Sequence, residues 1–317
     1  MTDWPNHAAP WREWRSAIGS SRMHHGWILA GKVGLGKSEF ALAAARELVD
    51  EPGTAQPVEH PDIITISFGP KDDKEERKRE NGKPYELSKV IRVREVRAMQ
   101  RRLTTRPTLG SRRVIIIKPA DEMNKEAANA LLKSLEEPPQ GTFFILVAHR
   151  PSRLLPTIRS RCRVLRFPLL TDEDLARMLA DEGHARDPLA LACAGGSYGA
   201  ALRFVEEDLA PLARLMEGLL SAGDPGFTAR ADLARMIGPR ADRNRWQAVF
   251  DLAQGLTSQR AGAVQNGAER EALINAYTGL VELSAQAPTH NFDTGLLSLE
   301  IGTLLVSAHA ASEPAHG

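Results

Sequence analysis

The chain reads Gly31-Lys32-Val33-Gly34-Leu35-Gly36-Lys37-Ser38, which fits the phosphate-binding pattern G-x-x-x-x-G-K-[ST] without a mismatch. The glycines allow the backbone to curl so that successive N–H groups point at phosphate oxygens. Lys37 is placed to bring positive charge to the β- and γ-phosphates, and the Ser38 hydroxyl is suited to ligate Mg²⁺. This phosphate-binding loop, or P-loop, therefore predicts a site for ATP or ADP, with or without Mg²⁺.

The segments on both sides of the P-loop supply the context that the motif requires. Residues 27–30 form a short apolar run that is typical of a buried strand. After the loop, Phe40, Ala44 and Leu48 recur at helical spacing on one face. A strand leads into the loop and a helix leads out of it, with its positive dipole end at the phosphates. We therefore interpret the match as a nucleotide site rather than as a coincidence of composition.

Further strand-like runs follow at intervals up to about residue 165. Residues 62–66, 114–117 and 143–147 are each rich in apolar side chains, as expected of central strands in a parallel sheet. Helix-like stretches separate these runs, and strands alternating with helices predict parallel pairing with crossover connections. The sequence therefore predicts an α/β P-loop nucleoside triphosphatase domain with a parallel sheet.

Two of the connecting stretches have individual signatures. Asn124 is suited to cap a helix that runs to Leu135 and stops before Pro138-Pro139. Residues 69–84 are polar and mixed in charge, and we expect them to form a surface loop.

The pattern changes after Phe167-Pro168, because helical periodicity continues there almost without strand-like runs. Thr171 and Asp174 resemble a capping arrangement at the start of the first helix. We therefore expect three domains: a nucleotide-binding domain over residues 1–167, a small helical lid over 168–207, and an all-α domain over 208–317.

Composition limits the other classes of function. The net charge of the 317 residues is +1, so no global field attracts nucleic acid, and no run of eighteen apolar residues predicts a membrane span. Cys162 and Cys193 are too few for a disulfide framework or a four-thiolate zinc site, so we expect a reduced, cytoplasmic protein. His24 and His25 are adjacent, and on an extended segment they should point to opposite faces rather than share a metal.

The residues that normally support hydrolysis are missing from the expected place. An acid at the end of a neighbouring strand usually holds Mg²⁺ and a second orients the attacking water. After the strand at 114–117 come Lys118 and Pro119, which can do neither. Asp121 and Glu122 follow later, and we interpret them as turn residues. The chain is therefore expected to bind a nucleotide and to hydrolyse it poorly or not at all.

Three short stretches resemble one family. Residues 130–139 are similar to the ALLKxLEEPP segment of bacterial clamp-loader subunits, which are AAA+ proteins. Ser160-Arg161-Cys162 resembles their SRC motif, and His60-Pro61-Asp62 resembles the HPD that precedes a strand in them. With the P-loop, the resemblance covers about residues 10–205.

Within this family the chain looks more like the delta-prime type than the gamma/tau motor type. The motor subunits carry Asp-Glu in place of Lys118-Pro119, and an arginine in place of Gly199. Members commonly carry a four-cysteine zinc module before the HPD motif, but residues 50–59 here are short and contain no cysteine. The comparison of motifs therefore implies a nucleotide-binding member that hydrolyses weakly and carries no zinc.

The resemblance implies partners and a role for one arginine. It implies a five-subunit ring with gamma/tau and delta subunits that uses ATP to place a sliding clamp on primed DNA, with residues 208–317 as a helical collar. Arg161 would be an arginine finger that stabilises charge on a neighbouring subunit's ATP. Spacing alone favours the interpretation of Arg161 as an ordinary surface arginine, and only the match to the motif favours the finger.

A basic segment offers a DNA contact, with a simpler alternative. Residues 89–113 contain nine Lys/Arg and one acid, and Arg94, Arg97 and Arg101 are spaced to share one helical face. Such a face could neutralise phosphates without reading sequence, or it could be a solvated surface.

Two other functions remain open for the whole chain. One is an autonomous AAA+ ATPase that remodels protein or DNA, which Lys118-Pro119 disfavours. The other is a small-molecule P-loop kinase, which would leave the helical C-terminal third without a role.

Overall fold

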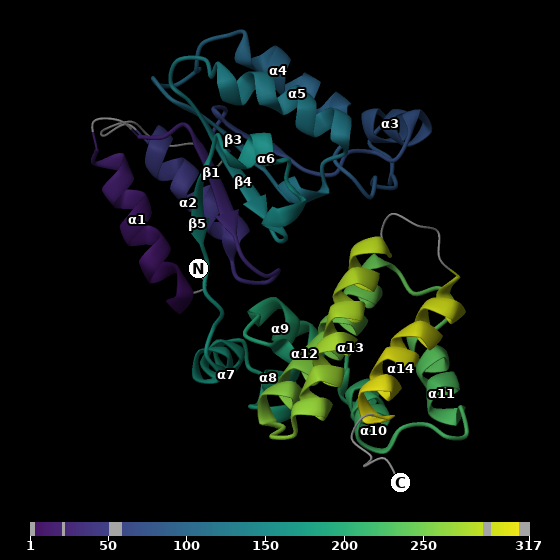
Figure 1. Ribbon diagram of the computed structural model, residues 1–317. Coiled ribbons are helices and arrows are strands. Elements are labelled where there is room, and N and C mark those ends of the chain that lie inside the picture. Colours follow the sequence, from purple (N-terminus) through teal and green to yellow (C-terminus); the bar gives the residue numbers. More distant parts are fainter. Residues whose placement is uncertain (1–3, 21–22, 51–58, 288–292, 311–317) are drawn as a thin grey trace. The chain divides into compact units, whose positions relative to one another are not determined.

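The computed structural model describes residues 4–20, 23–50, 59–287 and 293–310. The chain forms two compact units, one of Trp4–Leu169 and one that begins at Leu170 (Figure 1). None of the helices in these described ranges is long and apolar enough to cross a membrane.

The N-terminal unit alternates strands with helices, as expected from its sequence. Its elements are, in chain order, η1 (Pro5–His7), α1 (Ala8–Ile18), β1 (Gly26–Ala30), α2 (Lys37–Val49), β2 (Ile63–Ile66), α3 (Asp73–Glu80), α4 (Val93–Leu103), β3 (Arg113–Ile117), η2 (Ala120–Glu122), α5 (Lys125–Glu136), β4 (Thr142–Ala148), η3 (Pro151–Arg153), α6 (Pro156–Arg159) and β5 (Arg163–Arg166).

The strands form one five-stranded sheet in the order β2-β3-β4-β1-β5 (Figure 1). Every pairing in it is parallel, and Ile28 of β1 lies beside Leu146 of β4 and Val164 of β5. The P-loop strand β1 is thus an inner strand, and its carboxyl end lies beside that of β4. The predicted fold class, an α/β P-loop domain with a parallel sheet followed by helices, is confirmed.

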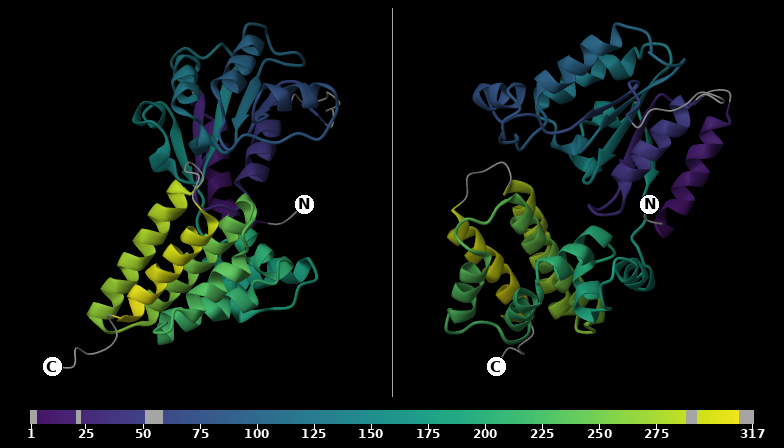
Figure 2. Two further views of the ribbon diagram at one scale, coloured as in Figure 1. Left: turned by 90° about the vertical axis from the view of Figure 1, so that its right-hand side faces the viewer. Right: turned by 180° about the vertical axis from the view of Figure 1, so that it is seen from behind.

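Helices cover both faces of the sheet, which explains the continuous apolar runs in the strands. Ile115 and Ile117 belong to a core with α4 and α5, whereas the fully buried Trp27 packs against Trp14 of α1 on the other face. Figure 2 shows α4 and α5 on one side of the sheet and α1 and α2 on the other. The expected cap of α5 is also present, because the Asn124 side chain accepts a hydrogen bond from the Ala127 N–H at 2.9 Å.

The expectation of a loop over residues 69–84 is wrong, because α3 lies within this stretch. Asp72 caps it by accepting hydrogen bonds from the backbone of Lys74 and Glu75. The Glu75 carboxylate is buried, and it binds Lys78 at 2.7 Å and the Glu86 N–H at 2.8 Å. A capped helix with ion pairs three residues apart can therefore form without the apolar stripe that sequence patterns rely on.

All the secondary-structure elements in the described residues of the second unit are helices. It contains α7 (Asp172–Asp181), α8 (Pro188–Ala194), α9 (Tyr198–Glu206), α10 (Ala210–Ala222), α11 (Thr228–Ile237), α12 (Arg243–Ala263), α13 (Gly267–Gln286) and α14 (Thr294–Ala310). The predicted cap at its start is confirmed, since the Thr171 hydroxyl accepts a hydrogen bond from the Asp174 N–H at 3.1 Å.

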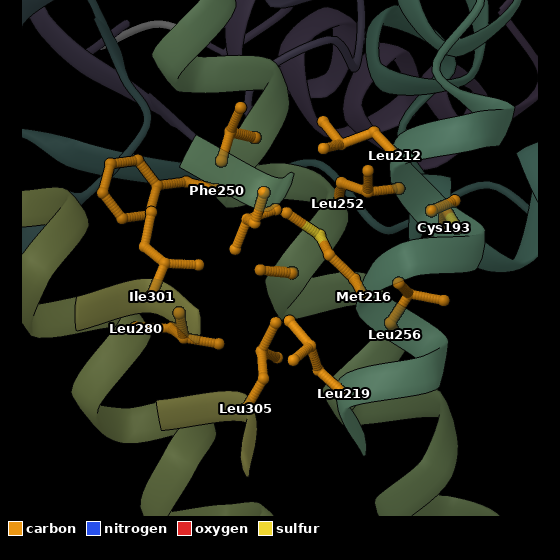
Figure 3. Packing of buried hydrophobic residues seen from close by; sticks show 14 of the residues in the cluster. Cys193, Leu212, Met216, Leu219, Phe250, Leu252, Leu256, Leu280, Ile301 and Leu305 are labelled. Atoms are coloured by element: carbon orange, nitrogen blue, oxygen red, sulfur yellow. The ribbon is translucent and has the colours of Figure 1, made fainter. Parts of the chain in front are cut away.

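One apolar core runs through α8 to α14 (Figure 3). Cys193 of α8 lies in the same cluster as Met216 of α10 and Ile301 of α14. A Cβ atom on Gly255 of α12 would lie 2.2 Å from the Cys193 carbonyl oxygen, so α8 and α12 touch backbone to backbone. The boundary between a lid and a collar at residue 207 stays a prediction.

Candidate functional site

The P-loop connects the carboxyl end of β1 to the first turn of α2, as the motif requires. The N–H of Gly31 donates to the carbonyl oxygen of Ala148 in β4, at 3.3 Å, so the loop starts against the neighbouring strand. Gly34 and Gly36 have φ angles of 77° and 71°. Side chains rarely adopt this left-handed region, which explains the glycines at these turns.

The backbone donors of the loop are available to an anion. In the part of the chain that the structure describes, no hydrogen bond from the N–H groups of residues 34–38 to another protein group is present. Three or more successive N–H groups at the start of a helix form a cradle for phosphate, and the dipole of α2 adds to it. The loop therefore fits a nucleotide phosphate, and the hydroxyl of Ser38 lies in the first turn of the same helix.

Lys37 is the buried cation of the loop, with only 3% of its surface exposed. Its Nζ donates hydrogen bonds to the carbonyl oxygens of Gly31, at 2.7 Å, and Lys32. Burial lowers the pKa of Lys37 to about 8, and the negative charge of Asp121 opposes this shift in part. A phosphate would restore the charge that burial disfavours.

The acid nearest in role to the missing carboxylates is Asp121, which the sequence analysis interprets as a turn residue. It lies in η2, buried, and its carboxylate accepts hydrogen bonds from the backbone N–H groups of His149 at 3.0 Å and Arg150 at 2.9 Å. Asp121 therefore ties the segment after β3 to the end of β4. No sequence signal marks these bonds, because the partners lie 28 and 29 residues away.

The two positions that directly follow β3 are Lys118 and Pro119. The Lys118 N–H continues the strand pairing by donating to Ile66 O at 2.9 Å. Glu122, which follows Asp121, forms ion pairs with Arg150 at 3.4 Å and Arg153 at 3.7 Å. Both acids thus bind residues that follow β4. Neither acid occupies the position directly after β3, where an acid that holds Mg²⁺ is expected in hydrolysing proteins.

The N-terminal residues bind the P-loop, which the sequence analysis missed. Nδ2 of Asn6 donates to the carbonyl oxygens of Leu35 at 3.5 Å and Pro168 at 3.1 Å, and His7 Nε2 bonds the same Leu35 oxygen at 2.8 Å. Burial lowers the pKa of His7, against the effect of this hydrogen bond. A neutral His7 with its proton on Nε2 therefore donates to the loop.

A second N-terminal contact restricts the loop at Gly36. A Cβ atom there would lie 2.4 Å from the Trp4 ring, which stacks on His7 with centroids 5.2 Å apart. Gly36 therefore meets two demands, a left-handed backbone and a close aromatic neighbour.

Arg161 lies between α6 and β5 and is partly exposed, with 36% of its side chain accessible. Its Nη2 is 2.8 Å from a carboxylate oxygen of Glu136, the last residue of α5. Its Nη1 donates to the carbonyl oxygen of Thr157 at 3.0 Å. The guanidinium thus lies at the surface with two defined contacts.

The close packing around position 162 explains why the residue after Arg161 is a cysteine. Cys162 is packed against Gly26, the first residue of β1. A Cβ atom on Gly26 would lie 2.9 Å from the Cys162 sulfur and 3.0 Å from the Arg161 carbonyl oxygen. Burial raises the pKa of the Cys162 thiol to about 12. Cys162 is therefore an anchor for the Arg161 backbone and no nucleophile.

His60-Pro61-Asp62 organises the approach to β2 and β3. Asp62 is fully buried and accepts hydrogen bonds from the Thr108 N–H at 2.8 Å and the Leu109 N–H at 2.9 Å. Arg113 is also buried, with 4% of its surface exposed, and its Nη2 lies 3.2 Å from a carboxylate oxygen of Asp62. Burial alone raises the pKa of Asp62, but the two N–H groups and Arg113 outweigh it and lower this pKa.

The three arginines of the basic face differ in their surroundings. Arg94 binds Glu95 at 2.7 Å, Glu76 at 3.5 Å and the carbonyl oxygen of Pro70, so it joins α4 to α3. Arg97 and Arg101 are on the same helix and exposed. Of these three arginines, Arg97 and Arg101 are therefore accessible to a phosphate backbone.

Within the described ranges, no group of three or more His, Cys, Asp or Glu side chains could hold a metal ion. The expectation of no zinc concerns residues 50–59, of which 51–58 lie outside the described residues. The expectation that His24 and His25 point to opposite faces is wrong, because their rings stack with centroids 4.7 Å apart. They precede the start of β1 at Gly26, so strand alternation does not apply to them.

A family described as "DNA polymerase III, delta subunit" matches residues 6–171. A DNA polymerase III subunit delta' of Pseudomonas aeruginosa is 36% identical over 207 residues, which are 59% of this chain and 58% of the relative.

Two further relatives have the same name, DNA polymerase III subunit delta'. That of Escherichia coli is 31% identical over 205 residues, 60% of this chain and 57% of its own length. That of Bacillus subtilis is 30% identical over 179 residues, 53% of this chain and 49% of its own length. The chain thus spans about half the length of these relatives.

Proposed function

We propose that this chain, which belongs to the delta-prime clamp-loader family of DNA polymerase III, binds ATP or ADP and donates Arg161 to the ATP of a neighbouring subunit. In this role it hydrolyses its own nucleotide poorly or not at all. The assembly it serves is a ring with gamma/tau and delta subunits, which places a sliding clamp on primed DNA in the cytoplasm.

The partly exposed guanidinium of Arg161 carries this proposal. Its backbone is anchored by the half-buried Cys162, and a Glu136 carboxylate oxygen lies 2.8 Å from its Nη2. An arginine held at a surface in this way can stabilise the charge that develops on a transferred phosphoryl group of another subunit. The guanidinium always carries its charge, so it can act without a proton transfer.

The nucleotide part of the proposal rests on the P-loop. Its N–H groups at residues 34–38 and the buried Lys37 are the groups that would hold the β- and γ-phosphates, and Ser38 would ligate Mg²⁺. Bound Mg²⁺ supplies charge neutralisation between the phosphates. At the end of β3, Lys118 and Pro119 offer no carboxylate for hydrolysis.

The second unit would provide the remaining parts of the subunit. We propose residues 168–207 as a helical lid and residues 208–317 as the collar through which subunits associate, after a nucleotide-binding domain over 1–167. The exposed Arg97 and Arg101 are our candidates for the DNA phosphates, with Arg94 supporting their helix.

The test is an ATPase measurement with and without the partner subunits. We expect negligible turnover by the purified chain, and DNA- and clamp-stimulated turnover after gamma/tau and delta subunits are added. Arg161→Ala should lower hydrolysis at the site it serves by about 10³-fold. Arg159→Ala is the matched control, because Arg159 is exposed nearby and makes no ion pair among the described residues.

The alternative, an autonomous AAA+ ATPase, is favoured by one observation, the buried Asp121 whose charge acts on Lys37. It predicts robust turnover by the isolated chain that Asp121→Asn removes and Arg161→Ala leaves unchanged. That pair of results would replace the proposal with the alternative.

A further inference from the structure

Arg161 and Glu136 come from the two stretches that resembled clamp-loader motifs, and the fold joins them. Glu136 is the last residue of α5, and Arg161 follows the last residue of α6 by two positions. Their charged groups lie 2.8 Å apart. The two segments are 25 residues apart in the chain (161 − 136), so this pairing follows from tertiary structure and from no local pattern.

The bonds of the guanidinium leave a defined set of donors. Nη1 donates to Thr157 O at 3.0 Å and lies 3.4 Å from Ser160 Oγ, and Nη2 binds Glu136. Among the described residues, Nε has no acceptor. A guanidinium has five N–H donors. The Nε–H therefore remains for an oxygen of a phosphate.

The backbone near Arg161 is already fixed, so the side chain decides where the guanidinium lies. Cys162 packs against Gly26, and the Arg161 N–H donates to Ile158 O at 3.1 Å. An unpaired arginine side chain would sample many rotamers at a partly exposed position. The Glu136 carboxylate at the end of α5 restricts these rotamers, because only some of them place Nη2 within 2.8 Å of it.

We propose that Glu136 is a positioning residue, which holds the Arg161 guanidinium in the orientation that meets the γ-phosphate of the neighbouring subunit. This inference rests on the proposed function of Arg161. Glu136 touches no substrate in this role and acts through Arg161 alone. Its loss would lower the rate of hydrolysis at the neighbouring site without weakening ATP binding there, because placement in the transition state is lost and ground-state binding is not.

The experiment uses the reconstituted complex with clamp and primed DNA, and measures kcat and KM for ATP. Glu136→Gln keeps the shape and removes the charge. It should lower kcat about tenfold and leave KM unchanged. Glu136→Asp, which keeps the charge on a shorter side chain, should recover part of this loss. Glu137→Gln is the matched control, since Glu137 is exposed, adjacent and without an ion pair among the described residues.

The double variant Glu136→Gln/Arg161→Ala separates the possible outcomes. If Glu136 acts through Arg161, the double variant should be as slow as Arg161→Ala alone. A further loss in the double variant would overturn the inference, and so would wild-type kcat or a raised kcat in Glu136→Gln. If Arg161→Ala itself leaves hydrolysis unchanged, the proposed function fails first, and the two failures are thereby distinguished.

Discussion

Nζ of Lys37 donates a hydrogen bond to the carbonyl oxygen of Gly31 at 2.7 Å, so the lysine and the first glycine of the P-loop are bonded to each other. A phosphate would need the same ammonium group. Binding therefore exchanges bonds within the loop for bonds to the ligand, and the loop is held near its binding shape before the ligand arrives.

We predict that Lys37→Met stabilises the free protein and removes nucleotide binding. Burial of the ammonium costs free energy that methionine does not, and the pKa near 8 corresponds to about 1–3 kcal/mol of unfolding free energy. The measurement is denaturant unfolding of both proteins, with and without ATP. Lys83→Met, at an exposed position, should change stability by less than about 0.5 kcal/mol. A destabilised Lys37→Met protein would contradict the prediction.

The same pKa predicts a pH dependence of stability. The pKa of Lys37 is lowered from 10.5 to about 8 in the folded protein, so the unfolded chain holds a proton that the folded one has lost between these values. Unfolding then takes up a proton, and the stability of the wild type rises with pH across this window. The difference in unfolding free energy between Lys37→Met and the wild type should shrink from pH 7.5 to pH 10.

Nucleotide affinity should fall as the pH rises, in contrast to the stability of the free protein. Below about pH 8 Lys37 is already charged, but above it binding must restore the proton. The dissociation constant for ATP should then rise by up to about tenfold per pH unit. Calorimetric titrations at pH 7.5 and pH 9 check this, and an affinity that is the same at both would show that Lys37 does not bind the phosphates.

Asp62→Asn should destabilise the N-terminal unit by about 3–5 kcal/mol, because it leaves the buried Arg113 without its counter-ion. Asp73→Asn is the control, since that side chain is fully exposed and 4.0 Å from Arg94. Thermal unfolding of the two variants makes the comparison. The pKa of Asp62 is lowered in the folded protein, so its contribution is present above the unfolded value and is lost as the pH falls through the folded one.

DNA binding of the complex should depend directly on Arg97 and Arg101, whereas Arg94 should act on stability. Alanine at either exposed position should reduce the slope of log affinity against log salt by about 1. Arg94→Ala should instead lower stability, because Arg94 binds Glu76 and Glu95. Equal slopes for all variants would assign these arginines to a solvated face.

The sheet and the P-loop were predictable because their signals are local. Apolar runs identified β1 to β4, whereas β5, with the sequence RVLR, was missed because it has no continuous apolar run. A contiguous motif set Gly31 to Ser38 at the turn after β1. The caps at Asn124 and Thr171 were found for the same reason, since each bonds a residue three positions later. All of these signals involve residues that are close together in the chain, so they can be recognised from one sequence.

Other features of the site depend on distant residues and could not be read in this way. Asp121 binds the end of β4, and Asn6 and His7 bind the P-loop from 28 or 29 residues away. The α3 helix was missed because its stability comes from a cap and from ions, which hydrophobic periodicity does not report. The sequence likewise contains Glu136 and Arg161 without any sign that they meet.

The contact of Gly255 with the backbone of Cys193 has a mechanical consequence. Helices that touch without side chains between them have no soft layer in which to slide, because backbone atoms cannot change rotamer. A displacement of α8 would therefore carry α12 with it, and the core they share would move as one lever. Gly255→Ala would place a Cβ atom 2.2 Å from the Cys193 carbonyl oxygen, so it would force the two helices apart.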